Sequence, residues 1–292
     1  MGTSSSYGGP TGRNPLLPDW AQPVGDGPAA PDSGQSPEGG PDQTGVDQAL
    51  DGNQPGTPAS NQPQAVPSVS FRGAKSSMTQ YVNSGGGGGG IGRVARHYVG
   101  ARGGAGRSAQ AAVSGRASTG RLGSFLSGVA SRGLDTAARE IGLGNLEGRP
   151  AIAVFAEIAN RLAPSGATLE EAAARRAVDD ALYALYKKFD LGTADISSLN
   201  NMDADTIRDA VEASVSAYIY HRWLQELGDR IEENAITTDE AVRLEKEVRD
   251  YVEHTVRLDL RDVDVLRLNW EGPEGSRIVE RIYREAYGLL ES

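Results

Sequence analysis

Residues 1–70 limit the fold of this chain more than any other stretch. They hold 12 of the 15 prolines and 12 of the 38 glycines, against seven leucines and valines and no isoleucine or phenylalanine. Such a stretch cannot bury enough apolar surface to offset the entropy that ordering costs. We therefore predict a disordered N-terminal tail over residues 1–70, with the folded mass of the 292-residue chain after it.

The rest of the chain predicts a mainly α-helical protein. Apolar residues recur at helical spacing from residue 148 onward, where capping boxes at Thr168 and Thr237 mark two helix starts. We assign residues 148–292 to an acidic helical domain of about five helices that should fold without the tail. Its one exception is "DVDVLRLNW" (262–270), whose alternating pattern indicates a strand or an extended crossing.

Residues 71–147 form a Gly/Arg-rich basic arm with weaker helical patterns and a hexaglycine hinge. Its many glycines predict poor autonomous helices, which need packing from elsewhere in order to form. We expect this arm to gain order only by lying on the acidic helical domain or on a partner.

The net charge of −10 separates into three blocks: residues 1–70 carry −6, residues 71–143 carry +8 and residues 144–292 carry −12. A basic block between acidic ones indicates either a site for an anionic partner or a contact within the chain. The candidate anion-binding residues are Arg93, Arg96, Arg102 and Arg107. Aromatic residues for base stacking are scarce, so we favour docking within the chain or on another protein over nucleic acid, which remains the alternative.

A search for catalytic chemistry yields no convincing constellation. The chain has no cysteine, and its three histidines show no metal-ligand spacing. His221 lies in an aromatic cluster near Trp223, which favours a packed histidine over a catalytic one. The carboxylates of Asp259, Asp262 and Asp264 fit a solvated loop better than a metal site. The hexaglycine produces dinucleotide-type matches without the required strand or acidic residue. We therefore expect no enzymatic activity, no cofactor and no metal.

No apolar run is long enough to cross a membrane, and no secretory signal precedes the tail, so we expect a cytoplasmic protein. Within the tail, "NPLLPDWAQP" (14–23) places Leu16, Leu17 and Trp20 among prolines, which is typical of a short docking motif. The opening also matches the myristoylation pattern, completed by Ser6, although one acyl chain anchors weakly without a basic patch. An inert terminus is the third interpretation.

The opening "MGTSSSYGGP", together with "SVSFRGAKSSMTQYVNSG" and "RVARHYVGARGGAGRSA", resembles the QatB proteins of the Qat anti-phage defence system of bacteria. The resemblance is close over residues 1–24 and 68–110, where Tyr98, Gly103, Gly104 and Arg107 match a similar run in that family. The helical half resembles the family only in general character.

This resemblance implies partners in a defence operon: an ATPase, a QueC-like enzyme and a TatD-like nuclease. It also implies that the QueC-like enzyme attaches a 7-deazaguanine to Gly2 once Met1 is removed. A glycine amine is unhindered, and its pKa near 8 leaves a useful neutral fraction at pH 7. The residues that the enzyme would recognise are Thr3, Ser4, Ser5, Ser6, Tyr7, Gly8, Gly9 and Pro10.

Overall fold

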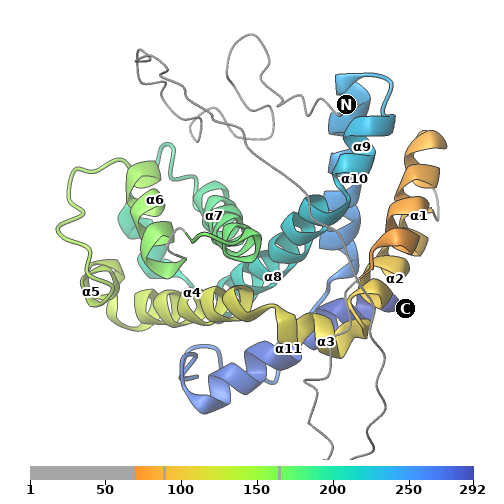
Figure 1. The fold of residues 1–292 in the computed structure, drawn as a ribbon. Helices are drawn as coiled ribbons and strands as arrows, with labels where there is room; N and C mark the ends of the chain where they lie inside the picture. Colours follow the sequence, from red (N-terminus) through yellow and green to blue (C-terminus); the bar gives the residue numbers. More distant parts are fainter. Residues whose placement is uncertain (1–69, 88–89, 164–165) are drawn as a thin grey trace, which may run out of the picture. The chain divides into compact units, whose positions relative to one another are not determined.

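The computed structural model of the protein describes residues 70–87, 90–163 and 166–292 (Figure 1). Within these ranges all regular structure is helical, as the sequence predicts. Contacts between Cα atoms gather residues Gln64–Ser292 into one compact unit. None of the described helices is both long enough and apolar enough to cross a membrane.

The basic block and the acidic block both supply helices to this unit. The basic block supplies α1 (Arg72–Asn83), α2 (Gly90–Ala101), α3 (Gly104–Ala111), α4 (Val113–Arg132) and α5 (Leu134–Glu140). The acidic block supplies α6 (Ala151–Leu162), α7 (Leu169–Lys188), the short 3-10 helix η2 (Ile196–Asn201), α8 (Ala204–Leu227), α9 (Asp229–Asn234), α10 (Thr238–Thr255) and α11 (Pro273–Glu291).

The helix starts that the capping residues predict from the sequence are confirmed by the hydrogen bonds of those residues. Thr168 accepts a hydrogen bond from the Glu171 backbone N–H, and the Glu171 carboxylate accepts one from the Thr168 N–H, so a complete capping box opens α7. Thr237 likewise accepts from the Glu240 N–H at the start of α10. Each cap satisfies backbone donors that have no partner inside the helix.

The glycine-rich α4 is a helix of 20 residues that lies against α7, α8 and α11 (Figure 1). Two of its glycines are sites of close approach. A Cβ on Gly115 would come within 2.6 Å of the Tyr218 ring, and one on Gly123 within 2.4 Å of the Trp270 ring. Low helix propensity is offset here by tertiary burial, which includes the fully buried Leu122. The sequence expectation that these helices need outside packing matches this arrangement.

No division between compact units occurs at residue 147 in the described part of the chain. Helix α3 packs extensively on α11, and α4 packs on α7 and α8. Buried side chains of the basic arm and of the acidic helices form one apolar core. The arm therefore lies on the acidic helices of its own chain and contributes to the same core.

Of the strand or extended crossing predicted for residues 262–270, the strand is wrong, because this segment consists mostly of turns. Alternation does appear in burial: Val263 and Val265 are buried while Asp264 is exposed. The backbone carbonyls of this segment accept hydrogen bonds from side chains rather than from a neighbouring strand. Arg208 donates to the Val263 carbonyl at 3.2 Å, and Ser127 donates to that of Val265 at 2.6 Å.

Candidate functional site

Three ion pairs join the basic block to the acidic helices. Lys75 of α1 pairs with Asp229 at 2.6 Å, Arg102 at the end of α2 with Glu226 of α8 at 2.8 Å, and Arg116 of α4 with Glu280 of α11 at 3.0 Å. The contact within the chain, one of the two interpretations of the charge blocks, is therefore present.

Acidic side chains also cap helices of the basic block. The Glu170 carboxylate accepts hydrogen bonds from the backbone N–H groups of Ser114 and Gly115 and from the Tyr218 hydroxyl at 2.8 Å. The Glu291 carboxylate accepts one from the Ala105 N–H at 3.0 Å. A negative charge at a helix N-terminus satisfies free donors and interacts favourably with the helix dipole. The two acids thus hold the starts of α4 and α3 against the acidic half.

The centre of this contact is the buried pair of Arg102 and Glu226. Their side chains are 7% and 13% exposed, and Arg222 also donates to the Glu226 carboxylate. The Arg102 guanidinium lies 5.7 Å from the ring centroid of Tyr98 and 5.9 Å from that of Tyr287. Burial works against the charged form of Arg102, but the tyrosines and Glu226 outweigh it and the pKa of Arg102 is raised.

The two tyrosines beside Arg102 are neutral at physiological pH. Burial raises the pKa of Tyr98 and raises that of Tyr287 to about 12. Neither hydroxyl has a hydrogen-bond partner among the described residues. Tyr98 stacks on Trp223 with ring centroids 5.2 Å apart. This centre therefore joins α2, α8 and α11 rather than offering a reactive group to a substrate.

The structure separates the four candidate anion-binding arginines. Arg102 is committed to Glu226 inside the fold, whereas Arg93, Arg96 and Arg107 are exposed. No Asp or Glu side chain within the described ranges pairs with any of these three, and Arg96 donates to the Ser292 main-chain oxygen at 2.9 Å.

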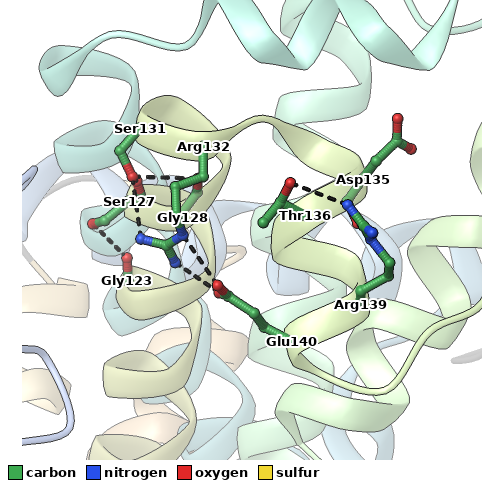
Figure 2. A network of polar contacts seen from close by, with 9 residues as sticks. All are labelled: Gly123, Ser127, Gly128, Ser131, Arg132, Asp135, Thr136, Arg139 and Glu140. Carbon is green, nitrogen blue, oxygen red and sulfur yellow. Dashed lines mark hydrogen bonds and ion pairs between the residues drawn. The ribbon is translucent and has the colours of Figure 1, made fainter.

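Two further arginines of the basic block stabilise the junction between α4 and α5. Figure 2 shows Arg132 paired with Glu140 at 2.7 Å, across the turn that joins the two helices. Arg139 donates to the backbone oxygen of Asp135 and to the Thr136 hydroxyl. These local contacts occupy both guanidinium groups with neighbours in the sequence.

His221 is packed, as the sequence suggests, and it also has an acidic partner that sequence reasoning missed. Its Nε2 lies 2.9 Å from the Asp180 carboxylate, to which Arg249 donates at 2.9 Å. Burial lowers the pKa of His221 despite this acid. Burial opposes ionisation of Asp180 as well, but His221 and Arg249 outweigh it and lower its pKa. We interpret the group as a link between α7, α8 and α10.

A shallow hollow of about 430 Å³ lies where the first turns of α8 meet residues 257–261. Its charges are already paired: Arg208 with Asp205, Arg257 with Glu212 and Arg261 with Asp259. The hydrogen bonds from Arg261 lower the pKa of Asp259 to about 2. Nowhere in residues 70–87, 90–163 and 166–292 do three or more acids or histidines gather in a way that could hold a metal ion.

The proposed modification and docking residues of the tail lie outside the described residues. These are Gly2, the recognition residues 3–10, and Leu16, Leu17 and Trp20.

Comparison with protein families identifies this chain over most of its folded part. A family model described as "Qat anti-phage system associated protein QatB" matches residues 103–290. No curated protein and no solved structure matches. The match covers the helical half, which resembles the family only in general character, and leaves the opening decapeptide outside. Because it spans more than half of the sequence, the chain belongs to the QatB family and is a component of the Qat anti-phage defence system.

Proposed function

We propose that this chain is a non-enzymatic defence component whose Gly2, exposed by removal of Met1, is modified with a 7-deazaguanine by a QueC-like partner enzyme. The observation that carries the proposal is the opening "MGTSSSYGGP" on a member of the QatB family. The compact unit starts only at Gln64, so the decapeptide lies more than 50 residues before it.

The chemistry asks little of this chain beyond a free amine. The neutral Gly2 amine attacks an activated carbon of the deazaguanine precursor, an N–C bond forms, the activating group leaves, and a base of the partner takes the amine proton. Residues 3–10 carry no charge, and six of the eight are glycine, serine or threonine, which suits entry into a narrow active site.

We assign docking of the defence ATPase, and of the TatD-like nuclease, to the helical unit. Its support is a set of large apolar side chains left exposed on α6 and α7. Tyr183 is 50% exposed and Ile152 is 45% exposed, and Tyr183 stacks on Tyr186. Exposed aromatic side chains are enriched where proteins bind one another.

Intact mass spectrometry after co-expression with the QueC-like partner tests the modification. We expect an adduct of nucleobase size that maps to the N-terminal peptide and disappears in Gly2→Pro, whose amine is secondary. The matched control Gly12→Pro changes the same tail and should keep the adduct. An unmodified wild-type tail, or an adduct that persists in Gly2→Pro, contradicts the proposal.

The alternative function is nucleic-acid binding through the exposed arginines. The observation in its favour is that Arg93, Arg96 and Arg107 are exposed and that none of them pairs with an Asp or Glu side chain among the described residues, although Arg96 donates to the Ser292 main-chain oxygen. Neutralising phosphates makes affinity fall steeply with salt. A gel shift near 50 mM salt that disappears when the three arginines are replaced together would favour it; no shift at that salt concentration rules it out.

A further inference from the structure

Two buried arginines, one directly after α2 and one on α8, share a single carboxylate. Arg102 donates to both oxygens of Glu226, at 2.8 and 3.1 Å, and Arg222 donates to the same carboxylate. Arg222 also donates to the side-chain oxygen of Gln225, which carries no charge. The Arg222 side chain is 13% exposed and that of Arg102 still less. Two guanidinium charges against one carboxylate leave a formal charge of +1 at a centre that is almost closed to solvent.

The neighbouring acids are already committed to other donors. Glu291 lies one turn after Tyr287 on α11, and its carboxylate accepts from the Ala105 N–H at 3.0 Å. Glu170 accepts from the Tyr218 hydroxyl and from two backbone N–H groups at the start of α4. Both acids therefore stabilise helix starts, and the charge between α2 and α8 is not offset by them.

The buried polar groups around this centre that lack a partner can all donate a hydrogen bond. They are the Nε–H groups of Arg102 and Arg222 and the hydroxyls of Tyr98 and Tyr287, none of which has a partner among the described residues. The indole N–H of Trp223, whose ring stacks on Tyr98, is unpartnered in the same sense. A guanidinium or indole N–H can only donate, and a buried donor without an acceptor destabilises the fold. The centre therefore requires an acceptor.

These donors come from three helical regions and lie around one guanidinium. The Cζ atom of Arg102 is 5.7 Å from the ring centroid of Tyr98 and 5.9 Å from that of Tyr287. Both tyrosine side chains are fully buried. Burial raises the pKa of both hydroxyls, and the charges of Glu226 and of the two arginines act on each of them as well. The hydroxyls are thus protonated donors beside the uncompensated charge.

The two requirements together define the class of ligand. A water molecule accepts two hydrogen bonds and carries no charge, so it would leave donors and the positive charge unmatched. A monatomic anion accepts several hydrogen bonds from any direction and supplies the one negative charge that a buried cation needs. A divalent oxyanion would reverse the sign of the charge. A small monovalent anion fits both the charge and the donors.

We propose that a small monovalent anion, of which chloride is the abundant example, binds at this centre. The hydroxyls of Tyr98 and Tyr287 and the Nε–H groups of the two arginines donate to it. The anion links the basic block to α8 and α11 at the point where charge pairing within the chain is incomplete. The site is internal, so it differs from the exposed arginines considered for nucleic acid, and it is independent of the proposed N-terminal modification.

Urea unfolding of the full-length chain in mixtures of chloride and gluconate tests the site. Urea adds no ions, constant ionic strength keeps the screening unchanged, and gluconate is too large for a buried monatomic site. An anion that binds only the folded state raises the folding equilibrium constant. This constant should therefore rise in proportion to the chloride concentration once chloride exceeds its dissociation constant. A constant value across all mixtures overturns the proposal and would assign the donors to water.

Two variants and a matched control locate the effect. Tyr98→Phe combined with Tyr287→Phe keeps both rings and removes two donors, so the dependence on chloride should disappear. Arg222→Gln leaves one guanidinium against one carboxylate and should have the same effect. The control is Tyr283→Phe, because Tyr283 is equally buried but its hydroxyl lies 3.0 Å from that of Thr119. It should keep the full dependence on chloride whatever stability it loses. A double tyrosine variant that keeps the wild-type dependence contradicts the site.

The width of the ³⁵Cl resonance gives a direct measurement on the folded chain. Chloride that exchanges with a protein site broadens the line, and excess bromide or unfolding in urea should remove this broadening. Arg222→Gln should lose most of it, whereas replacing the exposed Arg93, Arg96 and Arg107 by glutamine should keep it. The opposite result, with loss only in the triple variant, would place chloride on the exposed arginines and overturn the internal site.

Discussion

The indole ring of Trp270 lies against the backbone of Gly123, so closely that a Cβ at this position would come within 2.4 Å of ring atoms. The Trp270 Nε1–H donates to the Ser127 hydroxyl at 2.9 Å, one turn further along α4. The absence of a side chain at Gly123 therefore permits the packing of residues 263–270 on α4.

We expect Gly123→Ala to destabilise the protein by about 1–3 kcal/mol, because the extra methyl group overpacks a filled site. Helix propensity alone would favour alanine by about 1 kcal/mol. Gly100→Ala is the control, since no atom lies within 4 Å of a Cβ at that helical position. Urea unfolding of both variants gives the comparison; equal stability would contradict the close contact.

Replacing Glu226 by glutamine should cost about 3–5 kcal/mol, because the buried Arg102 charge loses its carboxylate partner. The matched control is Asp209→Asn, which breaks an exposed pair with Lys188 whose side chains are 47% and 70% exposed. That change should cost less than about 1 kcal/mol. The denaturant midpoints of the two variants separate the two cases. A loss of stability in the Glu226 variant no larger than that in the Asp209 variant would show that the pair of Arg102 and Glu226 is not buried in solution.

Asp179 gives a pH-dependent prediction. Burial raises its pKa to about 6, against an ordinary value of 3.8, despite the nearby Arg175. The folded state thus holds a proton more tightly than the unfolded state, and this group lowers the free energy of unfolding as the pH rises from about 4 to 6. Asp179→Asn should therefore stabilise the protein by about 1–2 kcal/mol at pH 7 and by little at pH 4. A gain that is the same at both pH values would contradict this.

Neither residues 70–147 nor residues 148–292 should fold as an independent domain. A fragment of residues 148–292 lacks α4 and exposes the apolar side chains of α7, α8 and α11 that α4 covers. We expect it to unfold without cooperativity, whereas residues 64–292 should unfold cooperatively. Circular dichroism during thermal unfolding distinguishes the two fragments, and a cooperative transition in 148–292 would contradict this expectation and support the domain boundary at residue 147.

Elements that depend on local interactions could be predicted from the sequence. The capping threonines Thr168 and Thr237 act within four residues of themselves, and both helix starts were found. The formation of helix α4 could not be predicted from its glycine-rich sequence. The absence of a side chain at Gly123 is favourable because the Trp270 ring packs there, and Trp270 lies far along the sequence. The turns at 262–270 were missed for a related reason: alternating burial on a helix surface resembles the alternation of a strand.

The division among the arginines was only partly accessible to sequence reasoning. Arg102 continues the apolar stripe of α2, four residues after Tyr98 and eight after Val94, while Arg93 and Arg96 lie off that stripe. This spacing could have marked Arg102 as buried. Its partner Glu226 could not have been identified, because the crossing of α2 and α8 depends on the whole core.

The contact of α3 with α11 has a consequence for synthesis. A ribosome adds about 5–20 residues per second, so α3 waits on the order of ten seconds before α11 is made. Until then the start of α3 lacks the Glu291 carboxylate and Arg116 lacks Glu280. Residues 1–272 already carry a net charge of −9, so these groups lack their specific partners rather than negative charge, and α11 is the element that completes their contacts.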